Sequence, residues 1–130
     1  MITRDDYFMG RDKSYPTDMT PDIEHNAYRM IALANVLLAR FGEGRKVNSG
    51  WRPPMLNAAT AGAAKHSLHM TAQAVDMEDD DGLLDSWCMS DFGQNQLVDI
   101  GLWLEHPAST KGWCHVQMVP PRSGNRVFFP

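Results

Sequence analysis

The sequence predicts an α+β fold: a small, mainly antiparallel sheet with helices packed on one side. Apolar residues recur at helical spacing over residues 21–41, whereas short strand-like runs at 46–52, 74–77 and 113–118 are separated by turns. Helical and strand-like stretches do not alternate regularly, as they would in a parallel βαβ sheet. The length of 130 residues suits one domain, which we place at residues 1–130.

Composition narrows the class of protein. The hydrophobic content of 43% is ordinary for a soluble globular domain, and no apolar run approaches the ~20 residues of a membrane span. Residues 1–6 lack the apolar segment of a signal peptide, so we expect synthesis in the cytoplasm. A net charge of −4 argues against a nucleic-acid partner. We expect a monomer with two buried free thiols, Cys88 and Cys114.

The first elements differ in how clearly the sequence defines them. Residues 1–19 are polar with little periodicity, so we expect a solvated N-terminal arm laid over the domain. The next helix begins at Thr20 and Pro21, where a hydroxyl caps the helix and proline takes its first position. Its apolar stripe continues to Phe41 and should pack on the sheet, and Gly42 ends it.

The middle of the chain is expected to place polar side chains near strand ends. The strand at 46–52 ends before two prolines, so Arg52 lies where a side chain can reach a cleft. Residues 55–64 are rich in alanine and predict a short helix or a loop with helical turns. The acidic run at 78–81 lacks the alternating ligand spacing of a calcium loop, so we expect a solvated turn.

The last third predicts a broken helix, a hairpin and a tail. The helix that starts near Leu83 is expected to break near Gly93. Two short strands, at 102–104 and 113–118, follow, joined by a turn. Residues 119–130 are expected to form an irregular tail, held to the body by two phenylalanines.

Three residues from separate segments predict a metal site in a cleft. His69 precedes Asp76 by seven residues; in one strand the two would face opposite ways, and in one helix they would lie about 10 Å apart along the axis. A histidine on an incoming loop and an aspartate on the following strand could instead bind one ion, usually zinc. His115, on another strand, supplies a third ligand, which leaves the fourth position to water, as in a catalytic site.

These motifs carry a family resemblance. The stretches Ser67–His69 and Ala74–Asp76, with Ser49–Arg52 upstream and His115 near the end, resemble the zinc D-Ala-D-Ala carboxypeptidase and L-alanyl-D-glutamate endopeptidase family. The resemblance covers roughly residues 20–120. It implies one zinc ion per chain and a peptidoglycan stem peptide as substrate, and many members of the family are bacteriophage endolysins.

The resemblance also implies roles for single residues. It selects His69 over His66, three residues earlier, as the first zinc ligand. It implies that Arg52 binds the substrate and polarises its carbonyl, a role that suits a planar guanidinium. One departure from the family is Ala72, where a glycine is usual in the loop between histidine and aspartate.

A second departure concerns the general base. Many members keep a glutamate or histidine two or three residues before the last ligand, where this chain has Gly112 and Trp113. If the strands on either side of the turn pair as a hairpin, Glu105 lies close to the row that contains His115, and we expect it to be the base. His106 is the alternative, but neighbouring strand residues face opposite ways.

Two functions follow from this site. The first is a zinc-dependent peptidase that hydrolyses a D-Ala-D-Ala or L-Ala-D-Glu bond of the stem peptide through metal-activated water, after phage lysis or a virion has delivered it to the cell wall. The alternative is a non-catalytic zinc domain of the same fold that binds the cell wall or builds a virion. Trp51, Trp103 and Trp113 could wall the cleft or pack in the core.

Overall fold

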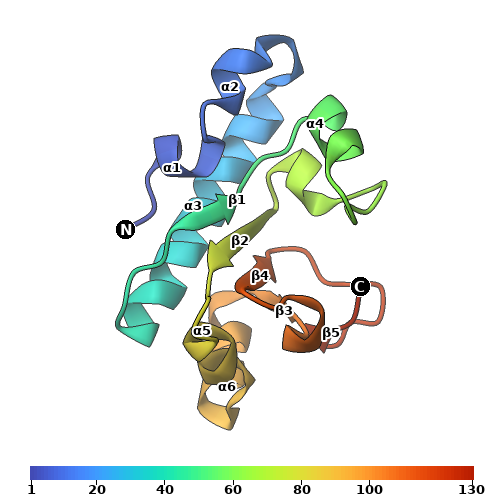
Figure 1. Ribbon diagram of the computed structural model, residues 1–130. Helices are drawn as coiled ribbons and strands as arrows, with labels where there is room; N and C mark the ends of the chain where they lie inside the picture. Colours follow the sequence, from blue (N-terminus) through green and yellow to red (C-terminus); the bar gives the residue numbers. More distant parts are fainter.

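A five-stranded sheet with six α-helices forms the protein, as a computed structural model of residues 1–130 shows (Figure 1). The strand order is β1-β2-β4-β3-β5, and every neighbouring pair is antiparallel except β3 and β5. The predicted α+β class is confirmed. The elements are α1 (Arg4–Phe8), α2 (Arg11–Ser14), α3 (Pro21–Phe41), β1 (Val47–Ser49), α4 (Pro54–Ala59), β2 (Ala74–Glu78), α5 (Leu83–Met89), α6 (Asp91–Ile100), β3 (Trp103–Glu105), β4 (Trp113–Gln117) and β5 (Val127–Phe128), with 3-10 turns at Pro16–Asp18, Leu68–Thr71 and Pro107–Ser109.

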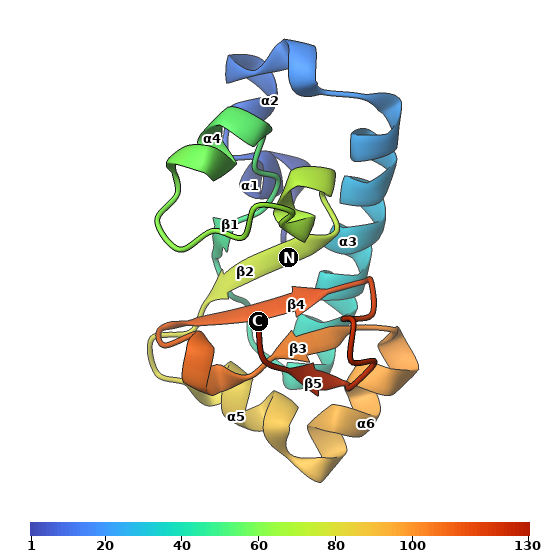
Figure 2. The same ribbon diagram turned by 90° about the vertical axis from the view of Figure 1, so that its right-hand side faces the viewer.

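The sheet separates a core face from a polar face. Side chains alternate along β2 and β4, so Val75 and Val116 enter the buried core while Asp76 and His115 point the other way. The core face is packed by α1, α3, α5 and α6, and Figure 2 shows α3 running behind the sheet with α5 and α6 beside β3. Helices on one side therefore leave the opposite face of β2 and β4 for the polar residues.

Helix α3 has the limits that its sequence predicts. Thr20 Oγ1 accepts a hydrogen bond from the backbone N–H of Ile23 at 3.2 Å, and Gly42 ends the helix with a left-handed φ of 94°. Its buried stripe is Ala27, Met30, Ala34, Leu37 and Leu38. Neither this helix nor any other combines the length and the apolar character that crossing a membrane requires.

Residues 1–19 differ from the solvated arm that their composition predicts. Thr3 and Asp6 form a reciprocal capping box that starts α1, and Tyr7 and Phe8 are almost completely buried. The Tyr7 hydroxyl donates to the carbonyl of Ala74 on β2 at 2.9 Å. Two adjacent aromatic residues give no helical period, so the sequence did not reveal that this segment completes the core.

The acidic turn and the helix break also differ in detail from prediction. Asp79 is buried rather than solvated, because its two carboxylate oxygens accept the backbone N–H groups of Leu84 and Asp85, each at 2.9 Å. The break between α5 and α6 falls at Ser90, whose Oγ accepts the N–H of Gly93 at 3.0 Å and caps α6.

The C-terminal tail is more regular than predicted. Residues 119–130 contain β5, which runs parallel to β3, with Leu104 opposite Val127. Phe129 is 67% exposed, so it does not anchor the tail in the core. The two cysteines are buried free thiols, as predicted, and Cys114 faces the core, away from the polar face.

Gly93 should be irreplaceable in this packing. A Cβ atom added there would lie 1.8 Å from the carbonyl oxygen of Trp87, a backbone atom that cannot move aside. We expect Gly93→Ala to lower the free energy of unfolding by about 3 kcal/mol or more, measured by urea denaturation. Gly44→Ala is the matched control, because a Cβ at Gly44 meets nothing within 4 Å. Equal midpoints for the two variants would contradict this reading.

Candidate metal centre

Three potential ligands converge on the polar face of the sheet. His69 lies in the 3-10 turn Leu68–Thr71, Asp76 in β2 and His115 in β4, and their ligand atoms lie within 4.8 Å of one another. Asp76 and His115 are direct partners in the antiparallel ladder. The Asp76 carboxylate is 3.3 Å from His69 Nε2 and 2.8 Å from His115 Nδ1. The structure therefore brings together the three residues that the sequence predicts as ligands.

His69 is oriented by the strand end beside it. Its Nδ1 lies 2.8 Å from the carbonyl oxygen of Gly50, so Nδ1 donates its proton there, and in the neutral ring Nε2 turns its lone pair toward Asp76. The backbone N–H of Arg52 donates to the His69 carbonyl at 2.9 Å. Gly50 is required here, because a Cβ would lie 2.1 Å from the backbone oxygen of Tyr7.

His115 is oriented by a residue that the sequence analysis missed, Gln117. The Gln117 amide nitrogen donates to the carbonyl of Val119 at 2.8 Å, so its oxygen must face His115 Nε2, 3.0 Å away. With a proton on Nε2, the Nδ1 lone pair is available toward Asp76. The signal in the sequence was the spacing of two residues, which places both side chains on one face of β4.

The two imidazoles thus fit a metal. Histidine ligands in metal sites donate their other ring N–H to an acceptor, which fixes the ring and the tautomer. Gly50 and Gln117 provide such acceptors for His69 and His115. Two imidazole nitrogens and one carboxylate oxygen are a donor set that zinc accepts, with a coordination position left open.

Electrostatics at the centre favour a cation. Burial opposes ionisation of Asp76, but hydrogen bonds from the His115 and His69 rings in their protonated form outweigh it and hold the Asp76 pKa well below its usual range. Burial disfavours the charged form of His115, yet Asp76, with Gln117, raises the His115 pKa above its ordinary value. A buried, ionised carboxylate needs a positive partner, which a proton on His115 or a bound metal can supply.

The three residues lie in a cleft of about 370 Å³ that Arg52 also lines. The Arg52 Nη2 donates to Ser67 Oγ at 3.1 Å, while its Nε is buried without a hydrogen-bond partner. No ion pair of the structure includes Arg52. Burial lowers its pKa and nearby Asp76 partly offsets this, but an arginine remains charged. The guanidinium can therefore receive an anionic or carbonyl oxygen from the cleft.

Glu105 lies across the hairpin from the metal ligands. β3 pairs with β4 in a register that joins Trp103 to Gln117 and Leu104 to Val116, so the next position places Glu105 opposite His115. Glu105 lines the same cleft. Burial raises its pKa, His115 lowers it in part, and the negative charge of Asp76 raises it further. This register is the one that the hairpin prediction requires.

The two alternative histidines lie outside the cleft. His66 is exposed and does not belong to the converging group. His106 stacks on Phe129 with ring centroids 4.4 Å apart, and its Nδ1 accepts the N–H of Ala108 at 3.0 Å. His106 and Glu105 therefore line different parts of the surface, as strand alternation requires.

The three tryptophans have three different positions. Trp113 lines the cleft. Trp51 is completely buried in the core and donates its Nε1–H to the carbonyl of Met70 at 3.1 Å. Trp103 lies under the guanidinium of Arg126, which is 4.3 Å from its ring centroid. Only one of them walls the cleft.

Ala72 has a backbone conformation that glycine adopts more readily than alanine. Its φ is 58°, in the left-handed region, where its N–H donates to the His69 carbonyl at 3.3 Å and closes the 3-10 turn. A non-glycine residue pays about 1–2 kcal/mol for this conformation. The Ala72 methyl group is completely buried in the core, which offsets part of that cost.

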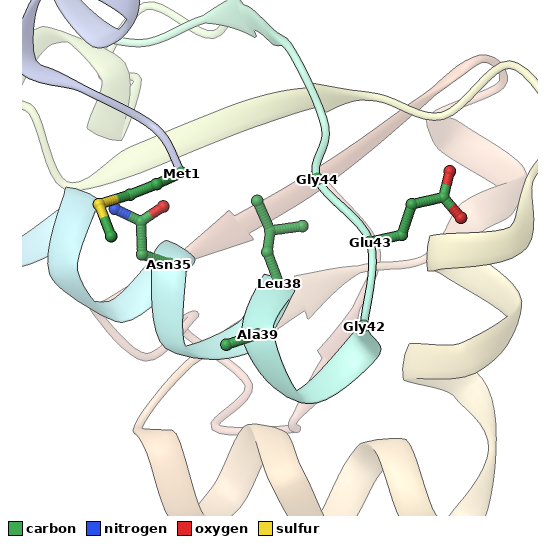
Figure 3. Close-up of a pocket in the computed structure, with 7 residues that line it drawn as sticks. All are labelled: Met1, Asn35, Leu38, Ala39, Gly42, Glu43 and Gly44. Carbon is green, nitrogen blue, oxygen red and sulfur yellow. The ribbon is translucent and has the colours of Figure 1, made fainter.

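A second hollow, between Met1 and the end of α3, lacks such chemistry (Figure 3). Its residues include one carboxylate, Glu43, whose side chain points away from Met1 and Asn35 in Figure 3. No histidine, cysteine or second acid lines it. The cleft on the polar face is the candidate site because it holds the converging group of His69, Asp76 and His115.

Three protein donors leave a zinc ion one position for water or substrate, as catalytic rather than structural zinc sites do, so the site is that of a candidate metalloenzyme. Comparison with protein families agrees: the family described as peptidase M15 matches residues 13–116, and the chain belongs to this zinc-dependent metallopeptidase family. The matched stretch holds Arg52, Glu105 and all three potential ligands. Searches of curated proteins and of solved structures gave no match.

The orienting role of Gln117 can be tested through metal affinity. Gln117→Leu keeps the side-chain volume but removes the acceptor for His115 Nε2, so we expect zinc affinity to fall by roughly 10- to 100-fold. Competition with a chelating dye would measure it. Gln96→Leu makes the same change on α6, where the amide oxygen accepts from Arg40. Wild-type affinity in Gln117→Leu would show that His115 does not need this partner.

Proposed function

We propose that this metallopeptidase holds one zinc ion through His69, Asp76 and His115 and hydrolyses a peptide bond of the peptidoglycan stem peptide. The observation that carries the proposal is the convergence of three ligand atoms within 4.8 Å, in the cleft that Arg52 and Glu105 also line. Membership of the peptidase M15 family supports it. The bond is of the D-Ala-D-Ala or L-Ala-D-Glu type.

Glu105 acts as the general base in this proposal. A zinc ion held by the three ligands would acidify a coordinated water and polarise the scissile carbonyl. Glu105 lines the cleft from the strand next to β4, and its raised pKa brings it closer to the pH at which it would work. It accepts the proton of the attacking water and returns it to the nitrogen of the departing amine.

Arg52 holds the substrate. Arg52 follows β1 in the chain and lines the cleft together with the ligands, and its Nε has no hydrogen-bond partner in the protein. A planar guanidinium can bind a carboxylate or a carbonyl oxygen through two parallel N–H groups. In this proposal Arg52 and Glu105 act on a substrate in the same cleft.

The alternative function is a non-catalytic zinc domain that binds the cell wall or belongs to a virion. It rests on Gly112 and Trp113, which leave no acid just before the last ligand. The carboxylate of Glu105 in the same cleft favours the catalytic proposal, because it can supply the missing group. We propose that the enzyme acts as a monomer and reaches the wall through phage lysis or as part of a virion.

Digestion of purified peptidoglycan tests the function directly. Mass analysis of the muropeptides should show loss of terminal alanine or new amino termini, and a chelator should abolish the change. The mass of the products identifies the bond. Unchanged muropeptides from protein with a full complement of zinc would favour the non-catalytic alternative.

The ligand assignment makes a separate prediction. We expect His69→Ala, Asp76→Ala and His115→Ala each to bind far less than one zinc per chain, measured by metal analysis after dialysis. Each variant removes one of three donors that come from separate segments. His66→Ala is the control and should keep its zinc. One zinc ion per chain in His115→Ala would show that His115 is not a ligand, and His66 or His106 would then be the third ligand.

Arg52→Lys separates charge from geometry. Lysine keeps the positive charge but offers no planar pair of N–H groups, so we expect turnover to fall by about 100-fold or more while zinc remains bound. Steady-state hydrolysis of a synthetic stem peptide, with zinc content measured in parallel, would show this. Unchanged turnover would place the substrate away from Arg52.

Glu105→Gln tests the general base. The amide cannot accept the proton of the attacking water, so we expect normal folding and zinc content with at least about a 100-fold loss of rate. The comparison is His106→Ala, which should remain active because His106 lies outside the cleft. An active Glu105→Gln beside an inactive His106→Ala would assign the base to His106.

A further inference from the structure

One wall of the cleft comes from a segment that the family match does not include. Pro130 lines the cleft together with Ser109 and Trp113, whereas the match ends at residue 116. In Figure 2 the chain leaves β5, crosses β3 and reaches the front of β4, where the mark for residue 130 lies. We call residues 126–130 the strap. It lies over the polar face, beside the metal ligands.

The strap is bound to the strand that carries Glu105. The backbone N–H of Leu104 donates to the carbonyl of Arg126 at 2.9 Å, and that of His106 donates to the carbonyl of Phe128 at 2.7 Å. These two bonds lie on either side of Glu105. The strap therefore continues the sheet at the position of the proposed base.

Side chains hold the strap outside the cleft as well. Phe129 stacks on His106 with an interplanar angle of 15°, and the Arg126 guanidinium donates to the carbonyl of Leu102 at 2.9 Å. On the side of the ligands, the Phe128 ring meets the ring of His115 edge-on, with centroids 6.2 Å apart. Contacts on both sides fix the position of the strap relative to the ligands.

We propose that the strap is a specificity-determining wall that limits the size of what enters the cleft. With this wall in place the cleft holds about 370 Å³, near the lower end of the roughly 300–1,000 Å³ of small-ligand sites. Arg52 and the loop Thr60–Ala64 line the same cleft. In this proposal the wall favours a short, unbranched peptide over a cross-linked one. Only this substrate preference rests on the proposed function.

The wall can be tested without metal or catalysis. Ser109 lines the cleft, and Ser109→Cys places a thiol there, while Cys88 and Cys114 are completely buried and should not react. The alkylation rate of the new thiol is measured with iodoacetamide, which is small, and with a bulky fluorescein maleimide. The ratio of the two rates reports the size limit. The chain without Ser109→Cys gives the background.

Two changes to the strap should move this ratio in opposite directions. Arg126→Ala with Phe129→Ala removes contacts that lie outside the cleft, and opening of the strap should raise the bulky-reagent rate by about fivefold or more. Pro130→Trp adds volume to the wall and should lower that rate. Iodoacetamide should react at nearly the same rate in all variants.

A matched control removes the same residue types elsewhere. Arg122→Ala with Phe92→Ala changes an exposed arginine and an exposed phenylalanine away from the cleft, and should leave both rates unchanged. Bulky-reagent rates that neither strap change alters would overturn the proposal. A change shared equally by both reagents would also overturn it, because it would report a general loosening rather than a size limit.

The substrate preference is then measured on peptides. The ratio of kcat/KM for an uncross-linked stem peptide to that for a cross-linked dimer should fall when the strap is loosened. An unaltered ratio would overturn the preference. If alkylation responds as expected but neither peptide is cleaved, the strap does limit the size of what enters the cleft, and the proposed function is wrong. Failure of the size limit can therefore be distinguished from failure of the proposed function.

Discussion

The contact of one carboxylate with two imidazoles is the constraint on which the structure depends. Asp76 lies between His69 and His115, with oxygen-to-nitrogen distances of 3.3 and 2.8 Å. An ionised carboxylate in a buried position is costly unless opposite charge and hydrogen bonds compensate it. The fold therefore has to place both imidazoles against Asp76, and the surrounding contacts can be understood as the means of doing so.

Strand register is the first of these means. β2 and β4 pair over five residues, from Ala74 opposite Gln117 to Glu78 opposite Trp113. A slip of one residue in either strand would turn Asp76 or His115 toward the core and bring an apolar side chain to the polar face. Apolar partners on the other face, such as Val75 and Val116, would lose their burial in such a slip, so the slip would raise the free energy of the fold. Core packing and ligand geometry thus select the same register.

Local signals predicted most of the candidate site, and contacts distant in sequence account for the rest. The cap at Thr20 and the apolar period define α3, and alternation in the strands gives the positions of Asp76 and Glu105. Tyr7 escaped prediction because its burial depends on β2, far away in the chain. β5 is only two residues long and is stabilised by its pairing with β3. A two-residue strand is too short to show a periodic pattern in the sequence.

The strand order has a consequence for how the chain can fold as it is synthesised. β4 lies in the middle of the sheet, between β2 and β3, although it is the fourth strand to leave the ribosome. The segments up to β2 contain only two of the three potential ligands, and neither they nor β3 can complete a sheet before β4 arrives. A nascent chain therefore holds one unpaired edge on β2 and one on β3 until β4 pairs with both, which makes this the stage most exposed to aggregation.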